Sequence, residues 1–119
     1  MRIAYVEDDA ANIALLGRIC NMNQDELVTY RNPMVALVEI DTVPVDLIII
    51  DMHLGDDQID GLELTRKLRS RGVAAPIIAI TSYDNIYARH YTEAGCNGYI
   101  QKPVAVQDVV NLINEYRKL

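Results

Sequence analysis

Five short aliphatic runs alternate along this chain with five longer segments in which apolar residues recur at helical spacing. Uninterrupted runs such as 47–50 are typical of strands buried on both faces, whereas the longer segments are typical of amphipathic helices. This alternation predicts an α/β fold in which helices cover a parallel sheet. The expected strands span 2–6, 26–31, 45–50, 76–81 and 98–101.

Residues with a strong capping preference mark the expected helix ends. Asp9 precedes the first helical segment, Asn32 precedes a proline that opens the second, and Asp60 opens the third with a glutamate three positions later. The third helix should end near Gly72, and the last two should span 84–93 and 106–118. The apolar stripes expected to face the core are Ile13, Leu16, Ile19 and Cys20, then Met34, Leu37 and Val38, then Leu64 and Leu68, and finally Val106, Val109, Val110, Ile113 and Tyr116.

Composition narrows the classes of function. A chain of 119 residues suits one domain, 1–119, which can bury roughly two-thirds of its unfolded surface without disulfides. The excess of 17 acidic over 11 basic side chains argues against direct nucleic-acid binding, which depends on Lys and Arg. No apolar run approaches the roughly 18 residues of a membrane span, and no signal-peptide pattern opens the chain. We therefore expect a cytoplasmic protein with no membrane segment and with Cys20 and Cys96 as thiols.

Polar residues stand at the carboxyl ends of the expected strands. Right-handed crossovers restrict five such units to a doubly wound sheet, and both common strand orders place a ligand crevice at these ends. Glu7 and Asp8 follow the first strand, and Asp51 follows the third. Thr81 ends the fourth strand and Lys102 follows the fifth. In the order 2-1-3-4-5 the first and third strands are neighbours, so the three carboxylates would lie close together.

Carboxylates that crowd one another must shift their pKa values or recruit a cation. Magnesium suits this site, because proteins hold it with one or two carboxylates, waters and phosphate oxygens. Lys102 supplies a compact positive charge and Thr81 a hydroxyl, both suited to phosphoryl oxygens. The set therefore predicts phosphoryl transfer to a carboxylate, with Asp51 as nucleophile. Asp9 is interpreted only as a helix cap.

Five short motifs in this order and spacing resemble the receiver domain of two-component response regulators, over essentially the whole chain. They are Glu7-Asp8, residues 46–51, Asp60-Gly61, residues 76–81 and residues 98–103. The resemblance implies a flavodoxin-like (βα)5 fold with strand order 2-1-3-4-5. It also implies a phosphoacceptor signalling domain with no catalytic activity beyond Mg-dependent self-phosphorylation and autodephosphorylation.

The same resemblance implies a role for each matching residue. Asp51 would accept a phosphoryl group from a sensor histidine kinase or a phosphotransfer protein, with Mg²⁺ or Mn²⁺ held by Glu7, Asp8, Asp51 and the backbone carbonyl of His53. Lys102 and Thr81 would contact the phosphoryl group, and Tyr99 would be the switch aromatic. The peptide bond between Lys102 and Pro103 would be cis. The face of the fourth helix, fifth strand and fifth helix would contact a downstream protein target or output domain, and homodimer formation is compatible with this scheme.

The chain departs from the family pattern between Asp51 and Asp60. This loop is two residues longer than usual, adding Asp56 and Asp57, which we expect to stay solvated, and Gly55 replaces the usual proline. Two positions beyond Asp51 and Thr81 stand His53 and Tyr83, whose bulk is expected to shield the phosphoryl group from water and so tune its lifetime.

Two observations leave alternatives open. Tyr83, Tyr87 and Tyr91 should share one helix face, either packing within the domain or forming a partner surface, whereas His90 beside them is interpreted as a surface residue. A haloacid-dehalogenase-like phosphatase would need a second aspartate at the position of His53. The remaining alternative is a receiver-like interaction module that works without phosphorylation. Its affinity for magnesium would distinguish it from a phosphoacceptor domain.

Overall fold

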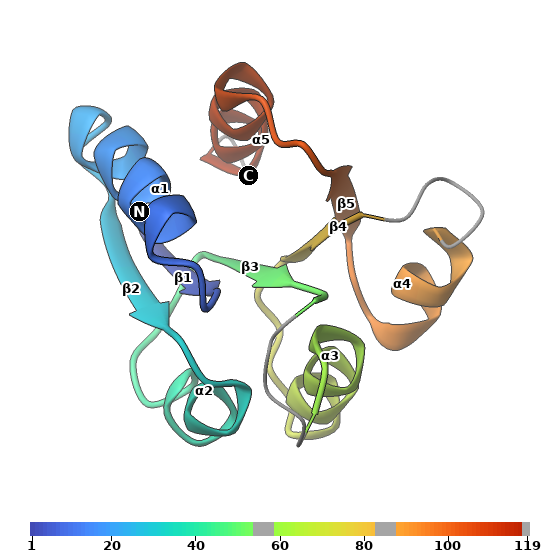
Figure 1. Ribbon diagram of the computed structural model, residues 1–119. Coiled ribbons are helices and arrows are strands. Elements are labelled where there is room, and N and C mark those ends of the chain that lie inside the picture. Colours follow the sequence, from blue (N-terminus) through green and yellow to red (C-terminus); the bar gives the residue numbers. More distant parts are fainter. Residues whose placement is uncertain (54–58, 83–87, 118–119) are drawn as a thin grey trace.

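A five-stranded parallel sheet forms the centre of the molecule, with strand order β2-β1-β3-β4-β5 (Figure 1). The structure, a computed structural model, describes residues 1–53, 59–82 and 88–117. The predicted fold class and strand order are confirmed. The strands are β1 (Arg2–Val6), β2 (Glu26–Tyr30), β3 (Leu47–Asp51), β4 (Ile77–Thr81) and β5 (Gly98–Gln101).

Helices cover both faces of this sheet (Figure 1). One layer contains α1 (Ala10–Met22) and α5 (Val106–Arg117), and the other contains α2 (Pro33–Glu39), α3 (Gly61–Ser70) and α4 (Ala88–Ala94). Every residue of β3 and β4 is buried, and alternate side chains enter opposite layers. Ile48 and Ile50 pack towards α2 and α3, whereas Leu47 and Ile49 pack towards α1 and α5, as the period-two geometry of a strand requires.

The capping residues lie where the sequence predicts them. Asp9 Oδ1 accepts a hydrogen bond from the backbone N–H of Ala11, Asn32 caps α2, and Asp60 Oδ1 accepts one from the N–H of Glu63. Gly72 follows α3 with φ +87°, a left-handed conformation that suits glycine at a helix end. Local side-chain caps therefore set the first residues of α1, α2 and α3, and Gly72 sets the end of α3.

The predicted buried face of α2 is right at Leu37, which packs against the core, and wrong at Met34 and Val38. Met34 and Val38 are 37% and 64% exposed, and the helix instead turns Pro33 and Ala36, followed by Ile40, towards the sheet. The small side chain of Ala36 allows α2 to pack close to the sheet. Hydropathy alone does not predict that this residue faces the core. Val106 is also exposed at the first position of α5, although Val109 and Ile113 are buried as expected.

The described part of α4 begins at Ala88. The predicted start of the fourth helix, together with Tyr83 and Tyr87, lies outside the described residues. Tyr91 is buried in the core. Cys20 and Cys96 are free, buried thiols. Within the described ranges no helix is both long and apolar enough to cross a bilayer.

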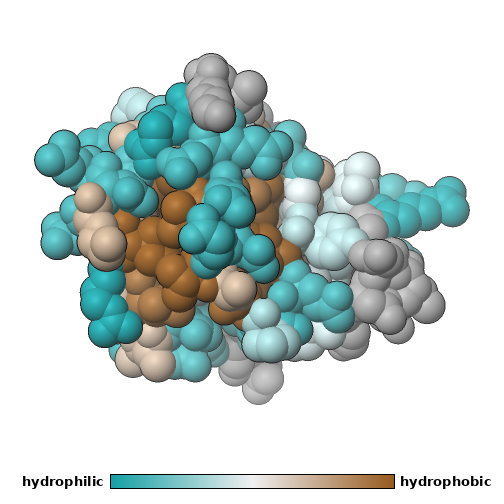
Figure 2. All heavy atoms as spheres, turned by 90° about the horizontal axis from the view of Figure 1, so that it is seen from above, coloured by the Kyte–Doolittle hydropathy of each residue, from teal (hydrophilic) through white to brown (hydrophobic). Residues whose placement is uncertain are grey.

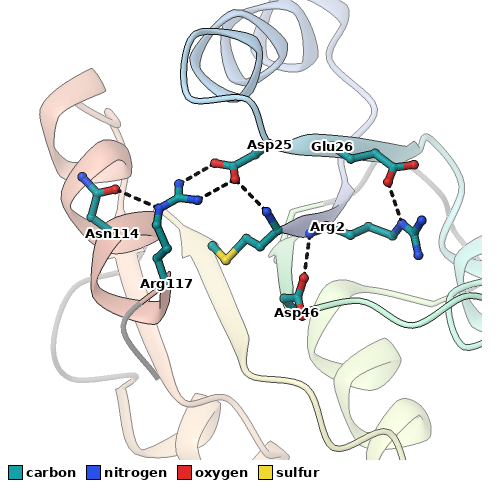
Figure 3. Close-up of polar contacts among 7 residues, drawn as sticks. Arg2, Asp25, Glu26, Asp46, Asn114 and Arg117 are labelled. Atoms are coloured by element: carbon teal, nitrogen blue, oxygen red, sulfur yellow. Dashed lines mark hydrogen bonds and ion pairs between the residues drawn. The ribbon is translucent and has the colours of Figure 1, made fainter.

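A buried carboxylate ties the end of α5 to the opening of β2 (Figure 3). Arg117 donates hydrogen bonds of 2.7 and 2.5 Å to the two carboxylate oxygens of Asp25, whose side chain is fully buried. The α-amino group of Met1 donates a third, at 2.9 Å. Hydrogen bonding to Arg117 holds the pKa of Asp25 below its ordinary value, although burial opposes this shift. The network joins the amino-terminal ends of the strands to the last helix.

Replacing Arg117 by methionine keeps much of the side-chain stem but leaves a buried carboxylate short of donors. We expect Arg117→Met to lower the free energy of unfolding by about 1–3 kcal/mol at pH 7. Because the folded-state pKa of Asp25 is lowered, the stabilisation is present above the unfolded pKa of about 3.9 and is lost as the pH falls below it. Urea unfolding at pH 7 and pH 3, with the exposed Arg18→Met as control, measures this. Equal losses at both pH values would contradict it.

Candidate functional site

Three carboxylates meet at the carboxyl ends of β1 and β3. Val6 is paired with Ile50 across these neighbouring strands, so the residues that follow each of them lie side by side. Glu7, Asp8 and Asp51 each offer an oxygen, and these atoms all lie within 4.8 Å of one another. The structure thus brings together the three acids that the sequence analysis grouped.

Lys102 reaches into this cluster from the end of β5. Its Nζ lies 3.0 and 3.2 Å from the two carboxylate oxygens of Asp51, whose side chain is only 4% exposed. The N–H of His53 donates a further hydrogen bond of 3.0 Å to Asp51 Oδ1. Burial opposes ionisation of Asp51, but these donors, together with Glu7, hold its pKa below the ordinary value. Asp51 is therefore an ionised carboxylate with one face held by a lysine.

The backbone also positions Lys102. Its N–H donates a hydrogen bond of 2.7 Å to the carbonyl of Thr81, which joins the ends of β4 and β5. The peptide bond from Lys102 to Pro103 is cis, as predicted. The lysine thus leaves the sheet beside the end of β4, and its side chain extends past that strand to reach Asp51 on β3.

Glu7 is the most deeply buried acid of the cluster, at 1% exposure. Asn12 donates a hydrogen bond of 2.6 Å to Glu7 Oε1, whereas Oε2 is buried without a hydrogen-bond partner among the described residues. Burial and the adjacent Asp51 carboxylate raise the pKa of Glu7 to about 8. An orphaned oxygen beside two more carboxylates requires a proton or a cation, and an all-oxygen donor set is the kind that magnesium prefers.

An apolar hollow beside Glu7 accounts for its poor hydration. Figure 2, which looks down on the layer of α1 and α5, shows hydrophobic side chains framed by hydrophilic ones. A cavity of ≈ 290 Å³ lies there. Glu7, Asn12 and Lys102 line it together with apolar side chains that include Leu16, Ile80 and Leu112. The acidic cluster therefore has low-polarity surroundings, which strengthen its electrostatic interactions.

Gly61 lets α3 begin directly against the backbone of the site. A Cβ atom at this position would lie 2.5 Å from the carbonyl oxygen of Asp51 and 2.7 Å from the Cα of Met52. Both are backbone atoms that cannot rotate aside. Gly61 and the capping Asp60 thus hold the amino end of α3 beside Asp51, which explains the Asp-Gly pair of the motif in packing terms.

Thr81 and Tyr99 lie on the side of the site that faces α4. Thr81 is fully buried, and its Oγ1 lies 2.5 Å from the Tyr91 hydroxyl and 3.4 Å from His53 Nε2. The Tyr91 and Tyr99 rings are 5.9 Å apart between centroids. Sequence reasoning placed Tyr91 on a tyrosine face and did not connect it to Thr81, because the contact joins two elements through tertiary packing.

Asn12 was also missed by sequence reasoning. An amide in the first turn of an amphipathic helix is unremarkable by itself. Its position five residues after Glu7, just beyond a capped helix start, was the one available signal. Of the remaining candidates, His90 is exposed as expected, whereas Gly55, Asp56, Asp57 and Tyr83 lie outside the described residues.

The fold and the acidic strand ends define a doubly wound α/β domain with a carboxylate site, and comparisons with known proteins identify its family. The chain matches the model of the response regulator receiver domain over residues 3–114. Response regulator MprA of Mycobacterium avium is 32% identical over 111 residues, which cover 92% of this chain and 48% of MprA. The chain thus spans about half the length of this relative. It belongs to the response regulator receiver domain family.

Solved structures agree on the fold. The receiver domain of a Francisella response regulator superimposes with a TM-score of 0.90 at 21% identity, covering 98% of this chain and 96% of that one. The receiver domain of a Pseudomonas aeruginosa sensor histidine kinase, with a magnesium ion coordinated in its active-site cleft, gives a TM-score of 0.85 at 23% identity, covering 99% and 98%.

The close approach at Gly61 yields a stability test. We expect Gly61→Ala to lower the free energy of unfolding by about 1–3 kcal/mol, because α3 must move away from Asp51 and Met52. Gly17→Ala in α1 is the matched control, since nothing lies within 4 Å of its added Cβ. That change should stabilise by about 0.5–1 kcal/mol through helix propensity. Urea unfolding of both variants measures this, and equal effects would refute the packing argument.

Proposed function

We propose that this chain is a phosphoacceptor receiver domain spanning 1–119 and that Asp51 accepts the phosphoryl group. The observation that carries the proposal is the state of Asp51, an ionised carboxylate held by Lys102 beside Glu7 and Asp8. An ionised oxygen is the nucleophile that the reaction needs, and the lysine charge can pass from the carboxylate to an arriving phosphoryl oxygen.

The proposed transfer forms one bond and breaks one. A carboxylate oxygen of Asp51 attacks the phosphorus atom, and the bond from phosphorus to the donor nitrogen breaks as the new P–O bond forms. The leaving nitrogen takes up a proton and departs as imidazole or, from phosphoramidate, as ammonia. Lys102 and Thr81 are proposed to hold phosphoryl oxygens through a charged ammonium and a hydroxyl.

Glu7, Asp8 and Asp51 are the residues proposed to hold Mg²⁺, or Mn²⁺ in its place, together with the backbone carbonyl of His53. The orphaned, buried Oε2 of Glu7 supports this assignment. A divalent cation here supplies neutralisation of the charge on carboxylate and phosphoryl oxygens. Asn12 orients Glu7 within this set through its hydrogen bond to Oε1.

The donor proposed for Asp51 is a sensor histidine kinase or a phosphotransfer protein. The consequence proposed for phosphorylation is a shift in population, in which Thr81 turns to the phosphoryl group and Tyr99 changes its rotamer. The surface of α4, β5 and α5 would then contact a downstream protein target or an output domain. The partial burial of Tyr99, whose ring lies next to that of Tyr91 on α4, supports a link between the Tyr99 rotamer and this surface.

Intact mass after incubation with Mg²⁺ and phosphoramidate tests the phosphoacceptor. We expect one added phosphoryl group on the wild type and on Asp108→Asn, an acid on α5. The adduct should be absent from Asp51→Asn and from a sample containing a chelator.

Magnesium titration of the same proteins completes the test. Saturable binding to the wild type and strong weakening in Glu7→Gln are the expected results. No adduct together with no magnesium binding would overturn the proposal and favour an interaction module that works without phosphorylation.

The side chain of His53 is proposed to lengthen the life of the phosphorylated state. It is exposed, and its Nε2 lies 3.4 Å from Thr81 Oγ1, so the imidazole stands over the approach to the site. We expect His53→Ala to speed autodephosphorylation severalfold, because water gains access to the acyl phosphate. The decay of the adduct after donor removal measures this. His90→Ala, which changes the other histidine of the chain, is the control and should decay like the wild type.

A further inference from the structure

The hydroxyl of Thr81 is held by α4. Thr81 Oγ1 and Tyr91 Oη lie 2.5 Å apart, a short hydrogen bond in which either group can donate. Thr81 is 0% and Tyr91 4% exposed, so water does not compete for this contact. A buried hydroxyl that loses its hydrogen bond costs free energy, and this contact therefore fixes the side-chain rotamer of Thr81.

Asp51 receives its hydrogen bonds from other groups. Its donors are the N–H of His53 and the ammonium of Lys102, and no hydrogen bond joins it to Thr81 in the described part of the chain. The Thr81 hydroxyl thus engages Tyr91 of α4, with His53 Nε2 3.4 Å away, rather than the acceptor carboxylate. A hydroxyl carries one proton, so donation to a phosphoryl oxygen and donation to Tyr91 exclude each other.

We propose that Thr81 donates this hydrogen bond and that Tyr91 is a positioning residue that holds the Thr81 hydroxyl away from the phosphoacceptor, so that the activated state forms only when the hydrogen bond breaks. This inference rests on the proposed function and adds a residue to it. Tyr91 belongs to α4, and the centroid of its ring lies 5.9 Å from the centroid of the Tyr99 ring. Release of Thr81 therefore changes the surroundings of α4 and of the switch aromatic in one event.

Tyr91→Phe keeps the buried ring and removes only the hydroxyl. Beryllium fluoride with Mg²⁺ serves as a non-covalent analogue of the phosphoryl group, and its apparent Kd reports the balance between resting and activated states. We expect Tyr91→Phe to bind the analogue about two- to tenfold more tightly than the wild type, the range that one net hydrogen bond supports. Tyr116→Phe on α5 is the matched control and should bind like the wild type.

A double-mutant cycle tests whether Tyr91 acts through Thr81. In the Thr81→Val background, Tyr91→Phe should leave the affinity for the analogue unchanged. Weaker binding by Tyr91→Phe would overturn the proposal, because it would mean that Tyr91 donates to Thr81 and supports the activated state. An equal effect in both backgrounds would also overturn it.

A measurement on the free protein separates this proposal from the phosphoacceptor assignment. Three-bond couplings to the Thr81 methyl group should report one χ1 rotamer in the wild type and rotamer averaging in Tyr91→Phe. If averaging appears but no variant binds the analogue, the phosphoacceptor assignment fails and the positioning role of Tyr91 stands. If the Thr81 rotamer is the same in both proteins, the positioning role fails.

Discussion

The crowding of Glu7, Asp8 and Asp51 is the constraint on which the site depends. Three acids whose oxygens lie within 4.8 Å of one another repel strongly, and the fold tolerates them only with charge or protons in between. Lys102 supplies part of that compensation at Asp51, while burial and the neighbouring Asp51 carboxylate leave Glu7 with a pKa raised to about 8. The site thus combines an ionised nucleophile with a carboxyl group that is costly to ionise. Both properties suit a cation and a phosphoryl group.

The buried central sheet offsets the repulsion among these carboxylates. The fully buried β3 and β4 fix the backbone from which Asp51 and Thr81 emerge, and Gly61 allows α3 to close against that backbone. At the opposite end of the strands, Asp25 and Arg117 tie the last helix to β2. Burial of the aliphatic core stabilises the fold, and the fold therefore tolerates the repulsion among carboxylates at the carboxyl ends of the strands.

Local chemistry explains which parts of the fold could be predicted. The strands follow from short aliphatic runs, and Asp9, Asn32 and Asp60 cap helices through side-chain oxygens that need no tertiary partner. On α2, Met34 and Val38 were wrongly predicted to be buried because their larger apolar side chains drew the prediction away from Ala36, whereas Leu37 packs against the core as predicted. In the folded chain the small residue faces the sheet, because packing distance rather than hydropathy decides the contact.

The succession of strands and helices along the chain, their caps and the polar residues at the strand ends all follow from local sequence, since each depends on neighbours within one or two helical turns. How those polar residues act depends instead on tertiary packing. The burial of Glu7 and the contact of Lys102 with Asp51 require helices and strands from distant parts of the chain to pack together. The pairing of Thr81 with Tyr91 depends likewise on α4 resting against the end of β4. Such contacts are set by distances between elements, which a pattern of residue types does not encode.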